Sequence, residues 1–211
     1  MKYILSLIAI AMSSMLSYAQ TDTNAKNILD KTVEKIKSYP AVEIVFDMAM
    51  ENKAENIHES YEGKAYMKEK MYKIEIMDQI NYFDGETIYT YMPDAEEVTV
   101  KLPDEDQESF LNPTILFDIH NQKFNQKLVE NKNGIAYIEL TPKAPHKQIK
   151  KIGVWIDTAK NTVQKVISYG KDGNDIIITI KSLKKPEQEL DITFFRFDTK
   201  AHPDVEINDL R

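Results

Sequence analysis

Histidines, serines and carboxylates are the residues of this chain that could carry catalysis or bind a metal, but their spacing forms no recognisable site. The four histidines, at positions 58, 120, 146 and 202, are scattered, and none has the H-x-x-x-H or H-E-x-x-H spacing of a metal site. The sequence has no G-x-S-x-G segment to expose a serine nucleophile and no cysteine to pair with a histidine. Because the chain has 34 acidic residues, carboxylates that lie close together in the sequence do not by themselves indicate a catalytic site. We therefore predict no catalytic residue, no metal, no cofactor and no enzymatic activity.

The composition indicates one acidic domain. The 211 residues suffice for a domain with a sizeable core. A formal net charge of -7 argues against a nucleic-acid partner, which would require a basic face. Glycine is scarce, and neither G-x-x-x-x-G-K nor G-x-G-x-x-G occurs to bind phosphate. Nine methionines and eleven tyrosines suit an adaptable apolar ligand site, although an ordinary core explains them equally well.

Residues 1–19 have the pattern of a secretory signal peptide. Lys2 supplies the positive charge, residues 4–12 are apolar, and residues 17–19 (SYA) form a small-x-small cleavage site. The apolar run is too short to cross about 30 Å of hydrocarbon comfortably, which disfavours a transmembrane anchor. We expect the mature chain to comprise residues 20–211 as one domain, because no linker or repeat interrupts it.

Residues 21–38 predict an amphipathic helix, capped by one of residues 21–23 and ended by Tyr39-Pro40. Such a helix either packs permanently on a sheet or acts as a movable lid, and the sequence alone favours permanent packing. The residues at helical spacing are Ala25, Ile28, Leu29, Thr32, Val33 and Ile36.

From Ala41 onward the apolar period changes to two, which predicts β-strands. Residues 42–50 alternate strongly, whereas residues 87–92 are apolar on both sides, with Tyr89 and Tyr91 on one face. Short turns such as Asp84-Gly85 indicate antiparallel pairing. We expect a sheet of about ten or eleven strands, the last at residues 190–197, and no core signal in residues 202–211.

Two segments interrupt the alternation. The acidic run at residues 104–108 is most simply a solvated loop, with a docking patch as the functional alternative. Residues 110–120 (FLNPTILFDIH) predict a short helix with Asn112 as N-cap and Pro113 as its first residue. Its apolar face is a candidate plug or second lid.

Five segments, in this order, resemble the LolA family of periplasmic outer-membrane lipoprotein carrier proteins. They are residues 83–93 (FDGETIYTYMP), 111–117 (LNPTILF), 137–143 (YIELTPK), 155–157 (WID) and 194–197 (FFRF). The resemblance covers almost the entire mature chain, and it lies in the order and spacing of these segments.

The resemblance implies an incomplete, strongly curved antiparallel β-barrel whose apolar concave face is closed by the N-terminal helix and the short helix as lids. It implies a periplasmic chaperone, expected to be a monomer, that takes acylated lipoproteins from an inner-membrane lipoprotein-releasing ABC transporter to an outer-membrane acceptor. Each CH₂ of an acyl chain that is exposed to water costs about 0.8 kcal/mol, so such a carrier must offer a dry face. It needs no catalytic residue.

Site residues are assigned from the alternation, as hypotheses that a one-residue shift of register would reverse. The expected acyl-binding residues are Val42, Ile44, Phe46, Met48, Tyr72, Ile74, Ile76, Tyr82, Tyr89, Tyr91, Val98, Val100, Ile138, Leu140, Phe195 and Phe197. The expected lid residues are Ile28, Leu29, Val33, Ile36, Ile115, Leu116 and Ile119.

The turn at residues 67–70 (MKEK) departs from the family pattern. Members of the family carry a basic-Pro turn there, and its arginine helps to hold the lid shut. Lys68 and Lys70 are the candidates to replace it, although a lysine lacks the planar fork of arginine. Two alternative functions use the same fold: a carrier of free lipid or glycolipid, and a regulatory module that senses lipoproteins.

Overall fold

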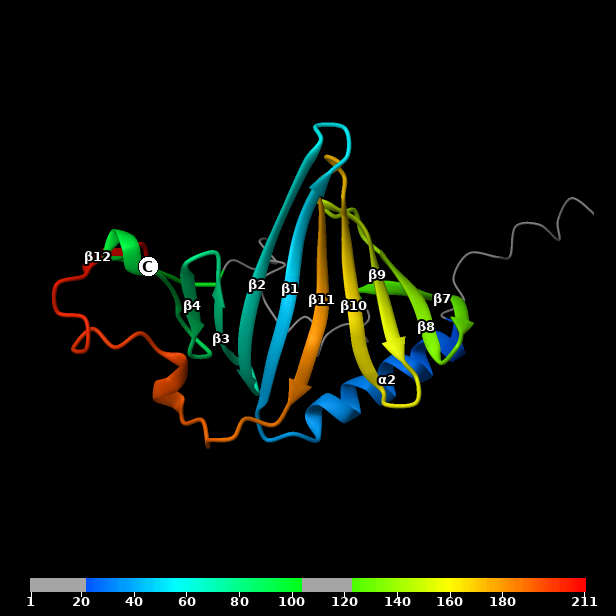
Figure 1. Cartoon of the computed structure of the whole chain (residues 1–211), viewed down its shortest axis with the longest axis horizontal. Helices are drawn as coiled ribbons and strands as arrows, with labels where there is room; N and C mark the ends of the chain where they lie inside the picture. The colour runs from blue at the N-terminus through cyan, green and yellow to red at the C-terminus, as the bar shows by residue number, and fades with distance from the viewer. Residues whose placement is uncertain (1–21, 104–122) are drawn as a thin grey trace, which may run out of the picture.

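The computed structural model of the chain describes residues 22–103 and 123–211, which form an open, curved sheet and an N-terminal helix (Figure 1). The mainly β, incomplete-barrel architecture expected from the sequence is confirmed. The expected signal peptide at residues 1–19 lies outside the described residues, as do the acidic run at 104–108 and the short helix with Ile115, Leu116 and Ile119.

Helix α2 (Thr23–Lys37) has the amphipathic face that its sequence predicts. Asp22 is the N-cap, and its carboxylate accepts the N–H groups of Asn24 and Ala25. Ile28 is half-buried, and the helix ends before Pro40. In the described ranges no helix is both long and apolar enough to cross a membrane. The buried residues of the helix are Ala25, Leu29, Thr32, Val33 and Ile36.

Twelve strands form the sheet, in the order β12-β6-β5-β4-β3-β2-β1-β11-β10-β9-β8-β7. Two antiparallel meanders, β1 to β6 and β7 to β11, are joined by the pairing of β1 with β11. The strands are β1 (Val42–Asn52), β2 (Ile57–Lys68), β3 (Met71–Ile76), β4 (Gln79–Phe83), β5 (Ile88–Met92), β6 (Glu97–Lys101), β7 (Phe124–Lys132), β8 (Ile135–Pro142), β9 (Ile149–Asp157), β10 (Thr162–Gly170), β11 (Asp175–Lys184) and β12 (Glu206–Asp209).

Helix α2 packs on one face of this sheet, which we call the inner face. The helix contacts β7 and β10, and its buried apolar residues belong to the same core cluster as the apolar residues of β1, β3, β8 and β9. The helix runs along the lower part of the sheet in Figure 1, whereas the hairpin tips lie at the top. The main core therefore lies between α2 and the sheet.

The opposite, outer face is covered over β2 to β6 by the C-terminal segment, residues 185–205. Phe197 packs against Tyr91 with ring centroids 4.9 Å apart, and Phe194 meets Tyr66 at the same separation. Leu190 and Phe195 are fully buried with Ala41. Strands β2 to β6 therefore bury apolar side chains on the outer face as well.

The prediction that the sheet ends with a strand at residues 190–197 is wrong. Residues 190–197, expected as a strand, contain instead a 3-10 helix, η2 (Ile192–Phe195). The carboxylate of Asp191 accepts the N–H groups of Thr193 and Phe194, and this local bonding competes with strand pairing. The tail forms β12, which pairs in parallel with β6 although all four of its residues are exposed. Backbone pairing without apolar alternation leaves no periodic signal.

Candidate functional site: an apolar inner face

Strand pairing fixes which side chains share the inner face. Ile44 of β1 lies opposite Ala65 of β2, which in turn lies opposite Ile74 of β3. On the other side of β1, Met48 lies opposite Ile178 of β11. Side chains directly opposite each other point to the same face, so the apolar positions of these strands form one continuous surface.

Nine of the expected acyl-binding residues lie on this surface. All nine are buried in the core cluster that includes α2, so the structure brings them together from β1, β3 and β8. They are Val42, Ile44, Phe46, Met48, Tyr72, Ile74, Ile76, Ile138 and Leu140.

Burial on the inner face is uneven. Near the start of β1 the side chains of Val42 and Ile44 are almost inaccessible to solvent. On β1, β2, β10 and β11, around the buried Met48, lies a group of apolar residues that is only half-buried. We call this group the half-buried row; it consists of Met50, Tyr61, Val166, Ile176 and Ile178.

The buried part of the inner face is a poorly hydrated environment. Burial raises the pKa of Tyr72 to about 12, because the ionised phenolate loses its hydration there. Gln126 of β7 is buried on the same face, opposite Leu140, and its Oε1 atom has no hydrogen-bond partner within the described residues. The surface therefore combines a large apolar area with few polar contacts.

The other seven expected acyl-binding residues do not share this face. Ile74 on the inner face lies opposite Asn81 of β4, so the adjacent residue Tyr82 points to the outer face, together with its partner Tyr89. The expectation of one common face is therefore wrong for these residues, which pack with or near the C-terminal segment instead. The residues concerned are Tyr82, Tyr89, Tyr91, Val98, Val100, Phe195 and Phe197.

The apolar pattern of β5 explains why these residues were assigned to the wrong face. Residues 87–92 are apolar on both sides, so their period shows which side chains share a face but not which face is the inner one. On the outer face, Arg196 donates a hydrogen bond to the Tyr89 hydroxyl at 3.2 Å and lies 3.4 Å from the Asp84 carboxylate. These contacts attach the C-terminal segment to the sheet, and the outer apolar residues are a second core.

Residues 79–198 match the family model described as "Outer membrane lipoprotein carrier protein LolA". This match covers more than half of the chain, from β4 through η2. The chain belongs to the LolA family.

Curated relatives and a solved structure agree with this assignment. Outer-membrane lipoprotein carrier proteins of Cupriavidus pinatubonensis and Cupriavidus necator are 29% and 28% identical over 131 residues. The match covers 61% of this chain in both cases, and the chain spans about three fifths of the length of each relative, 59% and 60%. An uncharacterised conserved protein from Thermus thermophilus shares the fold at 9% identity, with a TM-score of 0.57 over 89% of this chain and 99% of that chain.

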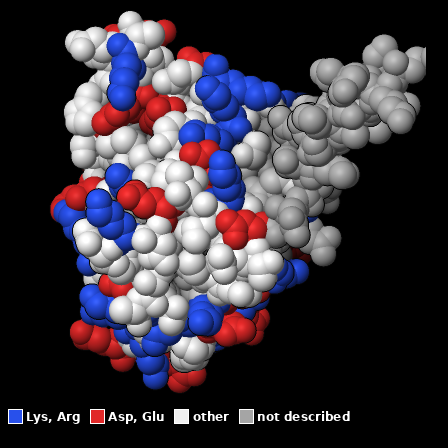
Figure 2. Space-filling model, turned by 90° about the vertical axis from the view of Figure 1, so that its right-hand side faces the viewer, with Lys and Arg blue, Asp and Glu red and all other residues white. Residues whose placement is uncertain are grey.

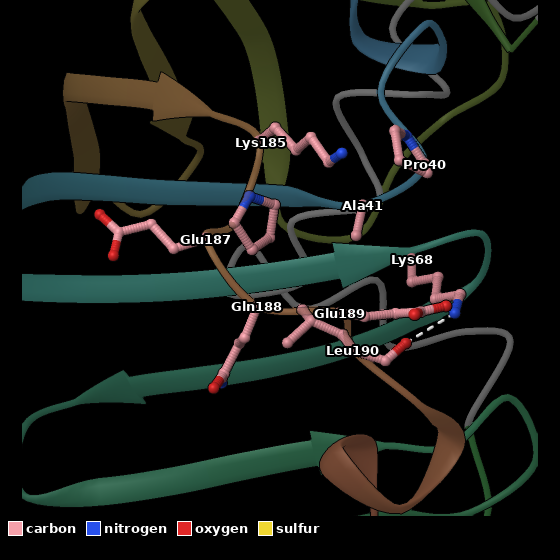
Figure 3. Close-up of a pocket in the computed structure, with 9 residues that line it drawn as sticks. Pro40, Ala41, Lys68, Lys185, Glu187, Gln188, Glu189 and Leu190 are labelled. Carbon is pink, nitrogen blue, oxygen red and sulfur yellow. Dashed lines mark hydrogen bonds between the residues drawn. The ribbon is translucent and has the colours of Figure 1, made fainter.

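Lys68, a candidate to replace the arginine of the LolA family, contacts the C-terminal segment. Its Nζ atom donates a hydrogen bond to the backbone carbonyl of Leu190 at 2.6 Å, whereas Lys70 is exposed. Lys68 and Leu190 line a pocket of about 460 Å³, and Figure 3 shows Lys68 directed at the Leu190 carbonyl. The pocket is lined by Pro40, Ala41, Lys68, Lys185, Pro186, Glu187, Gln188, Glu189 and Leu190.

The charged surface does not mark a chemical site. On the side shown in Figure 2, lysine and arginine side chains are interspersed with aspartate and glutamate, with uncharged surface between them. Among residues 22–103 and 123–211, no group of three histidine or acidic side chains is placed to hold a metal ion. What this part of the LolA-family chain offers is an apolar face.

Sequence reasoning missed the half-buried row as a group. Ile176 and Ile178 belong to a run of three isoleucines, whose period does not select a face. Their pairing with Met50 and Met48 selects it, because those residues belong to the strongly alternating β1. The alternation of β1, combined with antiparallel pairing, was the signal that could have identified the row.

Proposed function

We propose that this protein binds the acyl chains of lipoproteins on its inner face and carries them across the periplasm. The observation that carries the proposal is the half-buried row, which continues the buried inner face as apolar surface that solvent still reaches. The names of the curated relatives support the choice of lipoprotein as cargo. An inner-membrane ABC transporter would supply the cargo, and an outer-membrane acceptor would receive it.

The physical requirements of such a carrier fit this surface. Each CH₂ removed from water contributes about 0.8 kcal/mol, so a long acyl chain needs only apolar contact to be held. Met48 and Met50 lie on the inner face of β1, and methionine adapts to ligands of variable shape because its side chain is unbranched and polarizable. Release requires only a more favourable acceptor, so the transfer needs no catalytic residue and no cofactor.

Helix α2 is the proposed lid over one end of the face. Its residues Leu29, Val33 and Ile36 are buried against the sheet, and Ile28 lies at the margin of the same cluster. Access to the most deeply buried inner residues requires a shift of this helix. The half-buried row is accessible without such a shift, so it is the proposed point of first contact with an acyl chain.

Native mass spectrometry of the mature protein, purified from the periplasm without detergent, tests the function. The proposal predicts a one-to-one complex of a protein monomer with an acylated lipoprotein. A complex with phospholipid or glycolipid alone would contradict the lipoprotein cargo and favour the alternative of a free-lipid carrier. An empty protein that also fails to take up added acyl chains would contradict both.

A further inference from the structure

Strand β2 has an edge that is only partly used. β2 pairs with β1 from Ile57 opposite Asn52 to Met67 opposite Val42. Its pairing with β3, on the other side, includes only residues 64–68, because β3 ends at Ile76 and the chain reverses at Met77 and Asp78, both with positive φ. Among the described residues, residues 57–63 therefore pair on one side only.

This half-paired stretch, which we call the free edge, projects from the molecule. The β1–β2 hairpin rises above β3 and β4 at the top of Figure 1. Residues 57–60 and Glu62 are exposed, although they lie in regular strand. An exposed strand edge presents unpaired N–H and C=O groups at alternate residues and is a template for a further strand.

The hairpin that carries the free edge is held in place. Asn52, at the end of β1, is almost completely buried, and its amide donates a hydrogen bond to the side chain of Asn174 at 2.8 Å. Its Oδ1 atom accepts the N–H groups of Ala54 and Glu55 in the turn. The tip of the β1–β2 hairpin is thus joined to the turn between β10 and β11. An edge that is already ordered loses little conformational entropy when a partner binds.

The free edge adjoins the half-buried row. Tyr61 belongs to both, since it lies within residues 57–63 and faces Met48 on the inner side. A strand added to β2 would lie about 4.8 Å away, with alternate side chains directed to the inner face. An acyl chain attached to one end of the added strand would then lie along the inner face, while the peptide stays at the edge of the sheet.

The negative charge of the free edge favours some binding partners over others. Glu59 points to the inner side, where its carboxylate accepts the Tyr61 hydroxyl at 2.9 Å, and Glu62 pairs with Lys181 on the outer side. Two copies of the edge would bring carboxylates together, which disfavours self-association. A neutral peptide avoids this repulsion, and a basic peptide is in addition attracted by Glu59.

We propose that the free edge binds, by strand addition, the extended peptide that follows the acylated residue of a lipoprotein. This inference rests on the proposed function, and it assigns recognition of the protein part of the cargo to residues 57–63. The acyl chains lie on the inner face and the backbone of the peptide pairs with β2. Backbone pairing is largely independent of sequence, which suits a carrier of many different cargoes.

Synthetic lipopeptides test the proposal on the delipidated, full mature protein. One probe is an acylated cysteine followed by a neutral peptide of about seven residues, the length that spans the free edge at roughly 3.3 Å per residue. The second probe is the acylated cysteine amide alone. Two further probes carry N-methyl groups at odd or at even residues of the peptide, so that only one set blocks the backbone groups that face β2.

The unmethylated lipopeptide should bind the protein about tenfold more tightly than the acylated cysteine amide. Only one of the two methylated lipopeptides should lose this gain in affinity. Amide hydrogen exchange of residues 57–63 should slow with the lipopeptide and not with the cysteine amide. Equal affinities for all four probes, with unchanged exchange at residues 57–63, would overturn the inference and leave acyl binding intact. Failure of every probe to bind would instead contradict the proposed function itself.

A charge exchange provides a second test on the protein side. Glu59→Lys should weaken binding of a lipopeptide with basic residues and strengthen binding of one with acidic residues, by about threefold each. Glu55→Lys makes the same change of charge in the neighbouring turn and should alter neither affinity. The same effect from both variants would indicate long-range attraction and overturn the assignment to the edge.

Discussion

The ring of Phe46 on β1 occupies the space that a side chain would need at Gly63, its partner on β2. The two residues lie opposite each other, and a Cβ atom placed on Gly63 would overlap the Phe46 ring. Gly63 is buried, and the ring is 6% exposed. The glycine therefore allows a large aromatic residue to lie close to the sheet on the inner face.

Gly63→Ala should destabilise the protein, because the added methyl group must displace the Phe46 ring. We expect a loss of about 1–3 kcal/mol in the free energy of unfolding, as for overpacking elsewhere in protein cores. Urea unfolding followed by circular dichroism measures it. Ser60→Ala, at an exposed position of the same strand, is the control and should change stability little. Equal stability of all three proteins would show that Phe46 moves without cost.

Asp22 joins the start of α2 to the edge strand β7. One carboxylate oxygen caps the helix, and the other accepts the N–H of Leu128 at 3.0 Å. Asp22→Asn should keep the cap but lose the second acceptor, so we expect a loss of about 1 kcal/mol at neutral pH. Thermal unfolding measures it, and Glu34→Gln at an exposed position of the same helix is the control. An unchanged melting temperature would mean that the bond to Leu128 adds nothing.

The contribution of Asp22 should depend on pH. The N–H of Leu128 is the main cause that lowers the pKa of Asp22, burial acts against it, and the N–H groups of Ala25 and Asn24 lower it further. A lowered pKa stabilises the fold above the unfolded value of about 3.9, and this stabilisation is lost as the pH falls through the folded pKa. The stability difference from Asp22→Asn should shrink on acidification below about pH 4. A constant difference would contradict this.

Lys68 should hold the C-terminal segment to β2. Lys68→Met keeps the aliphatic length but leaves the Leu190 carbonyl without its charged donor, at an expected cost of about 1–2 kcal/mol. Amide hydrogen exchange in residues 190–197 should accelerate, while exchange in α2 should not. Lys70→Met, at the exposed neighbouring position, is the control. Faster exchange in α2 would instead indicate that Lys68 holds the lid, which is the role that the resemblance to the LolA family implies for an arginine at this turn.

The sequence predicts those parts of the fold in which one apolar face dominates. Helix α2 was expected at residues 21–38 and spans Thr23–Lys37, because its apolar residues, cap and terminating proline all agree. The alternation of β1 likewise places Val42, Ile44, Phe46 and Met48 correctly on one buried face. Local periodicity is enough where only one side of an element is buried.

Where both sides are buried, the sequence does not select the face. Tyr89 and Tyr91 were correctly paired with each other but assigned to the wrong side, since the C-terminal segment that covers them lies about 100 residues further along the chain. The same long-range packing explains η2, where Phe194 and Phe195 pack in one cluster with Tyr66, Ala41 and Leu190 through a tight turn instead of a strand. Such contacts follow from tertiary structure and leave no local pattern.

The most direct test of the central claim compares two adjacent isoleucines of β11. Ile178 lies opposite Met48 on the inner face, and Ile177 lies opposite Ala49 on the outer face, with both side chains half-buried. Binding of a fluorescent acyl probe to the delipidated variants should weaken about tenfold or more for Ile178→Glu and stay within about twofold for Ile177→Glu, because only Ile178→Glu places a carboxylate against the acyl chain. Circular dichroism checks that both variants are folded. Equal weakening, or a larger loss for Ile177→Glu, would contradict acyl binding on the inner face.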